Sequence, residues 1–176
     1  MSGRVFVDTN VFVYARESSD PQKRARAREW LELLWKDLRG RTSIQVLNEY
    51  YSVVTQQARF KVDREDAWSD IAELLEWNPQ DIDREVMARA YEIEGRYHLN
   101  WWDCLIVGAA QAQDCVLLLT EDMQDGAQYG SVIVRSPFTL RIADEAGAYT
   151  LPPRLSSRHR GRGRPRRNPR PATAAS

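Results

Sequence analysis

Four acidic residues of the sequence share one local setting, at the end of an apolar run or near the start of a predicted helix. They are Asp8, Glu49, Asp103 and Asp122. Strand ends and helix starts meet at one edge of an α/β sheet, where such folds bind their ligands. Carboxylates that converge there, in a chain with two histidines, suggest a hard divalent cation. The pattern therefore indicates metal-assisted chemistry on phosphate, with the ion activating water and offsetting charge on the leaving oxygen.

Each of these acids also has an ordinary structural interpretation. Asp8 could cap a helix and Asp103 could favour a helix dipole, while Glu49 could lie on a solvated face and Asp122 in a turn. Taken together, the four favour a site, because a carboxylate among apolar neighbours needs a partner. Without a cation they would repel one another and at least one pKa would rise.

The elements that must position these acids alternate along the chain. Apolar runs predict strands, and one-sided apolar patterns behind capping residues predict helices. Gly40 and Gly95 are expected to end two helices, and Thr42 with Gln45 resembles a capping box. Strands alternating with helices predict a parallel sheet in an α/β fold. The predicted strands cover residues 4–8, 41–43, 116–119 and 131–134, and the predicted helices 9–14, 21–39, 44–58, 64–77, 84–94 and 102–112.

Length and composition fit one domain with a sizeable core. The chain has 176 residues, and no apolar run reaches the ~18–20 residues of a membrane span. The first residues lead directly into a strand pattern, so no signal peptide is visible. Cys104 and Cys115 lie in predicted core elements and form no CxxC pair. A reduced, cytoplasmic protein that does not act at a membrane is therefore expected.

The zero net charge conceals two regions of opposite charge. Residues 154–176 carry eight arginines and no acid, which leaves 17 basic against 25 acidic residues in 1–153. We expect a folded domain over residues 1–150 and a disordered basic tail over 151–176, rich in Arg, Pro and Gly. Arg162 and Arg164 belong to an Arg-Gly-Arg segment that resembles an AT-hook. The tail is either a nucleic-acid contact or an incidental low-complexity extension.

Several other chemistries lack the residues they need. No Gly-rich Walker loop is present, which argues against nucleotide hydrolysis through a P-loop. His98 and His159 are the only histidines, so a histidine zinc site or a serine triad is incomplete. Asp8-Thr9-Asn10 superficially resembles a phosphatase with an aspartate nucleophile, but Asn10 stands where the second aspartate is usual.

Four short segments together resemble the motifs of PIN-domain proteins, most closely VapC-type toxins of prokaryotic toxin–antitoxin pairs. The likeness spans residues 4 to about 138, with the motifs in the expected order and spacing. The segments are Val-Asp-Thr-Asn-Val at 7–11, Leu-Asn-Glu-Tyr-Tyr at 47–51, Trp-Asp-Cys-Leu-Ile at 102–106 and Leu-Thr-Glu-Asp-Met at 119–123.

The resemblance implies a three-layer α/β/α fold with a central parallel sheet of four to five strands, and a Mg²⁺- or Mn²⁺-dependent endoribonuclease. Asp8, Glu49 and Asp103 match the core acidic positions, with Asp8 and Asp103 the first choice as direct ligands, and Asp122 matches the fourth. The supporting polar positions of the family are matched by Thr9, Asn10 and Thr120. The implied partners are an RNA substrate, a VapB-like antitoxin and a second copy in a homodimer. The alternative is a catalytically inactive PIN-fold scaffold that binds an antitoxin or nucleic acid.

Further residues near these motifs have open roles. Lys23, Arg24 and Arg28 could contact RNA phosphates, or form a solvated helix face. Asp125 is a lesser acidic candidate, and Glu121 is expected to point away from Asp122. The aromatic residues near the motifs could stack on bases, although core or dimer packing is favoured; they are Tyr50, Tyr51, Trp101 and Trp102.

Overall fold

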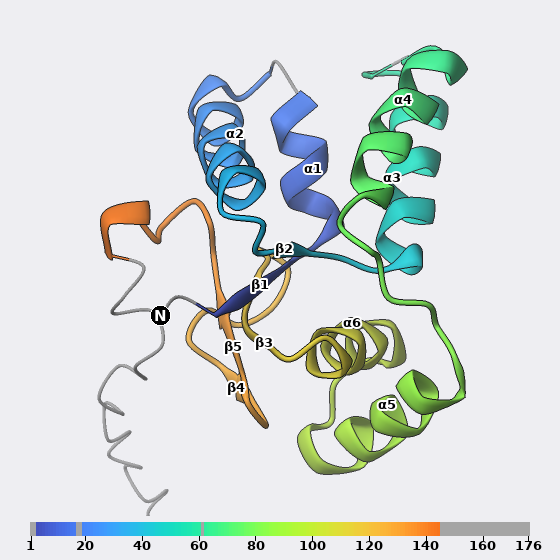
Figure 1. Cartoon of the computed structure of the whole chain (residues 1–176), viewed down its shortest axis with the longest axis vertical. Coiled ribbons are helices and arrows are strands. Elements are labelled where there is room, and N and C mark those ends of the chain that lie inside the picture. Colours follow the sequence, from blue (N-terminus) through green and yellow to red (C-terminus); the bar gives the residue numbers. More distant parts are fainter. Residues whose placement is uncertain (1–2, 17–18, 61, 145–176) are drawn as a thin grey trace, which may run out of the picture.

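A five-stranded sheet between two helical layers forms the protein (Figure 1). The computed structural model describes residues 3–16, 19–60 and 62–144. Helices α1–α4 lie on one face of the sheet and α5 and α6 on the other. The helices are α1 Thr9–Arg16, α2 Pro21–Lys36, α3 Ile44–Gln56, α4 Arg64–Leu75, α5 Arg84–Tyr97 and α6 Trp101–Ala112. The strands are β1 Arg4–Val7, β2 Gly40–Arg41, β3 Cys115–Leu119, β4 Gln128–Tyr129 and β5 Val132–Arg135.

The strand order places the first and third strands at the centre of the sheet. The order is β2-β1-β3-β5-β4, with β2, β1, β3 and β5 parallel and β4 antiparallel to β5. The predicted α/β/α fold with a central parallel sheet of four to five strands is thus confirmed, with β4 as an antiparallel strand at one edge. The short strand β4 was not predicted, because two residues with one exposed side chain carry no strand pattern.

The core is built where β1 and β3 pair. Val5, Phe6 and Val7 are fully buried, and so are Leu117 and Leu118. Strands covered on both faces by helices need such continuous apolar runs. Burial of each of these side chains contributes roughly 1.5–3 kcal/mol, so the two strand ends that carry Asp8 and Thr120 are rigidly placed.

Polar caps define where the site-bearing helices begin. The Asp20 side chain accepts a hydrogen bond from Lys23 N at the start of α2, and Asn100 Oδ1 accepts one from Asp103 N at the start of α6. The cap of α3 is Ser43, whose side chain accepts from Val46 N. The predicted capping box of Thr42 with Gln45 is therefore wrong by one residue. The Thr42 hydroxyl instead donates to Val7 O.

Neither glycine expected to stop a helix does so. Helix α2 ends at Lys36, and Gly40 lies in β2, where a Cβ atom would come within 2.5 Å of the Trp77 ring. Gly95 lies inside α5, which ends at Tyr97 with His98 in the left-handed conformation. Gly40 is thus required by close packing, a cause that sequence position alone does not reveal.

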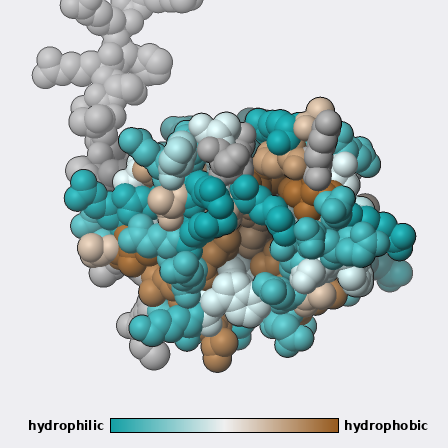
Figure 2. Space-filling view, turned by 90° about the horizontal axis from the view of Figure 1, so that it is seen from above, coloured by the Kyte–Doolittle hydropathy of each residue, from teal (hydrophilic) through white to brown (hydrophobic). Residues whose placement is uncertain are grey.

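The surface over helices α1–α4 is largely hydrophilic, with hydrophobic residues gathered in smaller patches (Figure 2). Trp68 of α4 is 59% exposed, although the apolar stripe that it shares with Ala67 and Ile71 predicts a place on the buried side of that helix. Within the described ranges, the helices are too short or too polar to cross a membrane. Both cysteines are buried free thiols. The basic tail of residues 151–176 lies outside the described residues.

Candidate functional site

The carboxyl ends of β1 and β3 bring the first and last acidic motifs together. The two strands are parallel neighbours, and Asp8 N donates to Leu119 O at 3.1 Å. Thr120 and Asp122 follow β3 directly, so they emerge beside Asp8. The parallel arrangement predicts this convergence, because successive strands of such a sheet end at the same edge.

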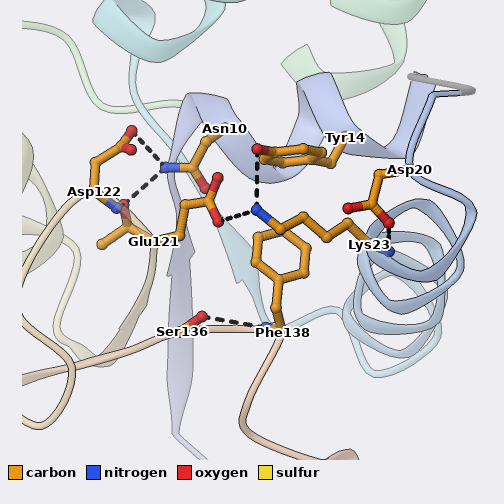
Figure 3. Close-up of polar contacts among 9 residues, drawn as sticks. Asn10, Tyr14, Asp20, Lys23, Glu121, Asp122, Ser136 and Phe138 are labelled. Carbon is orange, nitrogen blue, oxygen red and sulfur yellow. Dashed lines mark hydrogen bonds and ion pairs between the residues drawn. The ribbon is translucent and has the colours of Figure 1, made fainter.

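Asp8 is held by three hydrogen-bond donors. Its Oδ1 accepts from Thr9 N at 2.7 Å, and its Oδ2 accepts from Thr120 Oγ1 at 2.8 Å and from Asn10 Nδ2 at 3.2 Å. Asn10 Nδ2 also donates to Asp122 Oδ2 at 2.9 Å (Figure 3). One amide thus joins the carboxylates from the first and last motifs. The structure brings these residues into a single network.

The other two acids are tied to the same edge by hydrogen bonds from Thr9 and Asn100. The Thr9 hydroxyl donates to Glu49 Oε2 at 3.0 Å, which links α1 to α3. Asp103 lies in the first turn of α6, where Asn100 Nδ2 donates to its carboxylate. The side chains of Thr9, Asn10 and Thr120 thus donate hydrogen bonds to Asp8, Glu49 or Asp122, and their supporting role in the site stays a prediction.

All four acids line one pocket of about 310 Å³ between α1, α3, α6 and the end of β3. Glu121 lines it as well, and it was expected to point away from Asp122. Glu121 does take a different direction from Asp122: it reaches Lys23 Nζ at 2.6 Å, as Figure 3 shows. Among the described residues, Asp8, Glu49, Asp103 and Asp122 form no ion pair with a basic side chain.

Burial, with a smaller contribution from neighbouring negative charge, raises the pKa of two carboxyl groups in the pocket. Burial raises the pKa of Asp8 to about 6, and the charges of Glu49 and Asp122 add to the rise, against lowering by the hydrogen bonds from Thr120 and Thr9. Burial also raises the pKa of Asp103, helped by Asp122 and opposed by Asn100. Both groups are therefore harder to ionise than free carboxylic acids. A cation in the pocket would stabilise their charged forms and lower their pKa values.

The donor set fits a divalent ion in chemistry, although it is not gathered around one point. The pocket offers carboxylate oxygens and no sulfur or imidazole, the combination that suits Mg²⁺ or Mn²⁺. In the described part of the chain, no group of three or more acidic, cysteine or histidine side chains is arranged to hold a metal. The acids instead point to the donors of Thr9, Asn10, Asn100 and Thr120. The structure thus presents the pocket with its carboxylates satisfied by hydrogen bonds.

The three basic residues at the start of α2 are not in the pocket lining. Lys23 pairs with Glu121 at the pocket edge, donates to the Tyr14 hydroxyl at 3.1 Å and lies over the Phe138 ring (Figure 3). Arg28 Nε donates to Ala15 O, and Arg24 Nε is buried without a hydrogen-bond partner. Their expected contact with RNA phosphates stays a prediction.

Two other predictions concern Asp125 and the arginines of the basic tail. Asp125 lies outside the pocket lining and accepts from Arg135 Nε at 3.1 Å and from Ser136 N at 2.8 Å. This pairing gives it a structural part in holding the end of β5. Arg162 and Arg164 lie outside the described residues.

The pocket residues that sequence reasoning missed include three with amide or guanidinium side chains. Arg59 and Gln57 follow α3 at its end, and Gln45 lies at its start. No motif marks them, because they reach the pocket only through the way α3 packs beside α1. Trp102, which was expected to pack in a core or dimer, is 66% exposed and lines the pocket next to Asp103.

Comparison with known proteins agrees with this architecture. The family model described as PIN domain matches residues 5–124. No protein of curated function matches the sequence. A toxin–antitoxin complex from Klebsiella pneumoniae contains a chain of similar fold, with a TM-score of 0.58, 18% identity and coverage of 76% of this chain and 97% of that one. VapBC2 from Rickettsia felis, bound to a DNA fragment from its promoter, is similar with a TM-score of 0.54, 19% identity and coverages of 75% and 97%. FitAB bound to an IR36 DNA fragment has a TM-score of 0.60, 22% identity and coverages of 78% and 97%.

Proposed function

The chain belongs to the PIN domain family, and we propose that it is a metal-dependent endoribonuclease, the toxin of a VapBC-type toxin–antitoxin pair. The observation that carries this proposal is the pocket in which four acids from distant motifs meet without a basic partner among the described residues. Structural stability gives no reason to gather like charges, and the pKa of Asp8 is raised to about 6, mainly by burial and further by the charges of Glu49 and Asp122. Such an arrangement is maintained where chemistry requires it.

A Mg²⁺ or Mn²⁺ ion would be held by Asp8, Asp103 and Glu49, with Asp122 as the fourth acid, and would supply charge neutralisation and an activated water at a phosphodiester. Thr120 and Asn10 hold the Asp8 carboxylate in one orientation. The Thr9 hydroxyl does the same for Glu49. These donors keep the acids in place, so that little reorganisation is needed during the reaction.

The proposed reaction is in-line attack of water on the phosphorus of an RNA phosphodiester. The bond from phosphorus to the water oxygen forms as the bond to the 3′ oxygen breaks. The products are a 5′-phosphate and a 3′-hydroxyl, which end-group analysis of the fragments distinguishes from the products of a 2′-hydroxyl attack.

The partner proposal follows from the structural relatives. The Klebsiella pneumoniae and Rickettsia felis structures hold toxin and antitoxin together, which supports a VapB-like antitoxin for this chain. A homodimer remains a prediction, which gel filtration at micromolar concentration tests. The alternative, a PIN-fold scaffold without catalysis, predicts partner binding with no cleavage under any metal condition.

The test is RNA cleavage by purified protein with Mg²⁺ or Mn²⁺ and with EDTA. Asp8→Asn keeps the side-chain size but removes the charge, and we expect it to lower the cleavage rate by about a thousandfold or more. The matched control is Asp114→Asn, because Asp114 is an exposed turn residue with a left-handed φ of 55° that asparagine tolerates. Full cleavage by the Asp8→Asn variant, or by the wild type in EDTA, would end the proposal.

A further inference from the structure

A second hollow opens beside the acidic pocket and shares part of its lining. This base groove, as we call it, lies between the start of α3, the start of α6 and the segment before α5, and measures about 1020 Å³. Gln45, Glu49 and Trp102 line both the groove and the acidic pocket. The two hollows are therefore adjacent, so that an extended ligand can contact both.

The walls of the base groove are apolar and contain one large exposed ring. Ile44, Ile82 and Leu105 form the aliphatic part. Trp102 is 66% exposed, although it is the immediate neighbour of Asp103 on α6. A tryptophan left exposed at a proposed nuclease centre offers a flat surface for an unstacked base, since aromatic side chains stack on the bases of single-stranded RNA.

The polar groups in the base groove are mainly hydrogen-bond acceptors. Asp81 and Asp83 lie at its edge with Glu49. The side-chain oxygen Oε1 of Gln45 is buried and has no hydrogen-bond partner among the described residues, while its Nε2 contacts Trp102 O at 3.4 Å. A buried acceptor without a partner needs an explanation. A ligand that donates a hydrogen bond would satisfy it.

These features favour the base of a nucleotide over its phosphate as the group that the groove binds. The carboxylates repel phosphate, so the groove is unsuited to the RNA backbone, which would need cations. The same carboxylates accept hydrogen bonds from the exocyclic amino groups of bases, as acidic side chains do from cytosine N4. An apolar ring platform with acceptors at its edge matches a base that carries an amino group.

We propose that the base groove binds an unpaired, amino-bearing nucleobase, stacked on Trp102, beside the phosphodiester that the acidic pocket cleaves. This inference rests on the proposed nuclease function and names the part of the substrate that the site selects. Cytosine, adenine and guanine carry the required amino group, and uracil does not. Trp102 is then a specificity-determining residue rather than a member of the core.

Binding can be measured without cleavage in an Asp8→Asn background, with fluorescein-labelled single-stranded RNA of mixed sequence and fluorescence anisotropy. Adding Trp102→Ala should weaken binding by about 5- to 100-fold, the range expected for loss of one base–aromatic stack. Trp102→Phe should restore most of the affinity. The matched control is Trp68→Ala, because Trp68 is similarly exposed but lines a separate hollow between α3 and α4. Any contribution of the arginine-rich tail is equal in all variants.

A second experiment tests whether Trp102 acts on one particular base next to the cleaved bond. After the cleavage position has been mapped, the bases that flank it are replaced one at a time by an abasic nucleotide. At one flanking position, the abasic substitution should lower the wild-type kcat/KM by the same factor as the Trp102→Ala change does with the unmodified RNA. The Trp102→Ala variant should show no further loss with that abasic RNA. Replacing an amino-bearing base at that position by uracil should cause a smaller loss.

The outcomes separate this inference from the nuclease proposal. If the wild type cleaves RNA and Trp102→Ala binds and cleaves equally well, the inference is overturned while the nuclease function stands. If no RNA is cleaved but the Trp102 dependence of binding holds, the nuclease proposal fails and the base groove remains. Loss of antitoxin binding by Trp102→Ala, with RNA binding unchanged, would assign the groove to a protein partner and overturn the inference.

Discussion

Helices α1 and α3 both contribute to two polar clusters, one in which opposite charges pair and one in which like charges meet. Helix α1 begins at the acidic pocket with Thr9 and ends at Arg16, which belongs to a second cluster. There Arg16 makes two hydrogen bonds to Asp70 of α4, at 2.6 and 2.8 Å, and the buried Tyr50 hydroxyl donates to the same carboxylate. On α3, Tyr50 of this paired cluster is the neighbour of Glu49 in the acidic pocket.

The difference shows where folding and function make separate demands. In the paired cluster every charge meets its opposite, so α1, α3 and α4 are fastened together. In the acidic pocket the four carboxylates meet only neutral donors among the described residues, and burial raises the pKa of Asp8 to about 6. The first cluster should stabilise the protein and the second should destabilise it until a cation enters.

The largest stability effect is expected from breaking the paired cluster. Asp70→Ala removes the acceptor of the buried Tyr50 hydroxyl and the counter-charge of Arg16, which keeps only the Tyr50 oxygen as an acceptor. We expect a loss of about 3 kcal/mol in the free energy of unfolding, at the low end for buried pairs because these side chains are about one-third exposed. Urea unfolding measures it. Glu73→Ala, an exposed change on the same helix, should shift stability by less than about 0.5 kcal/mol.

The opposite sign is expected at Asp8 in the metal-free protein. Because its folded pKa of about 6 exceeds the ordinary 3.8, Asp8 adds stability below about pH 4, and this is lost as the pH rises through 6. In EDTA at pH 7.5, Asp8→Asn should therefore be more stable than the wild type by about 2 kcal/mol. At pH 4 the gap should close. An unchanged gap between the two pH values, measured by thermal unfolding, would contradict the buried acidic pocket.

The smallest effect should come from the ion pair of Lys23 with Glu121 at the edge of the acidic pocket. Lys23 neutralises Glu121 at 2.6 Å, with both side chains partly exposed. Lys23→Met should cost less than about 1 kcal/mol in stability. It should also tighten Mn²⁺ binding a few-fold, because Glu121 then adds its full charge to the pocket. Calorimetry on the double variant Lys23→Met, Glu121→Gln should show affinity near the wild-type value; continued tight binding would refute this account of Glu121.

What could be predicted from the sequence follows the range of the interactions involved. The strand runs that end at Asp8 and Thr120, and the caps Asp20 and Asn100, depend on neighbouring residues, so their patterns are visible. The convergence of the acidic motifs follows from the parallel sheet. Gly40, Trp68 and the pocket residue Arg59 owe their places to packing between distant elements, and no local pattern reveals such contacts. The cap of α3 was misplaced because Thr42 and Ser43 are equally suited to capping by type.

The central claim, that the four carboxylates of the acidic pocket together hold a divalent cation, is tested most directly by isothermal titration calorimetry with Mn²⁺ at pH 7.5. The account predicts saturable binding to the wild type that Mg²⁺ competes for, strong loss of that binding in Asp8→Asn, and wild-type binding in Asp114→Asn. Absence of Mn²⁺ binding to the wild type, or equal affinity in Asp8→Asn, would contradict it.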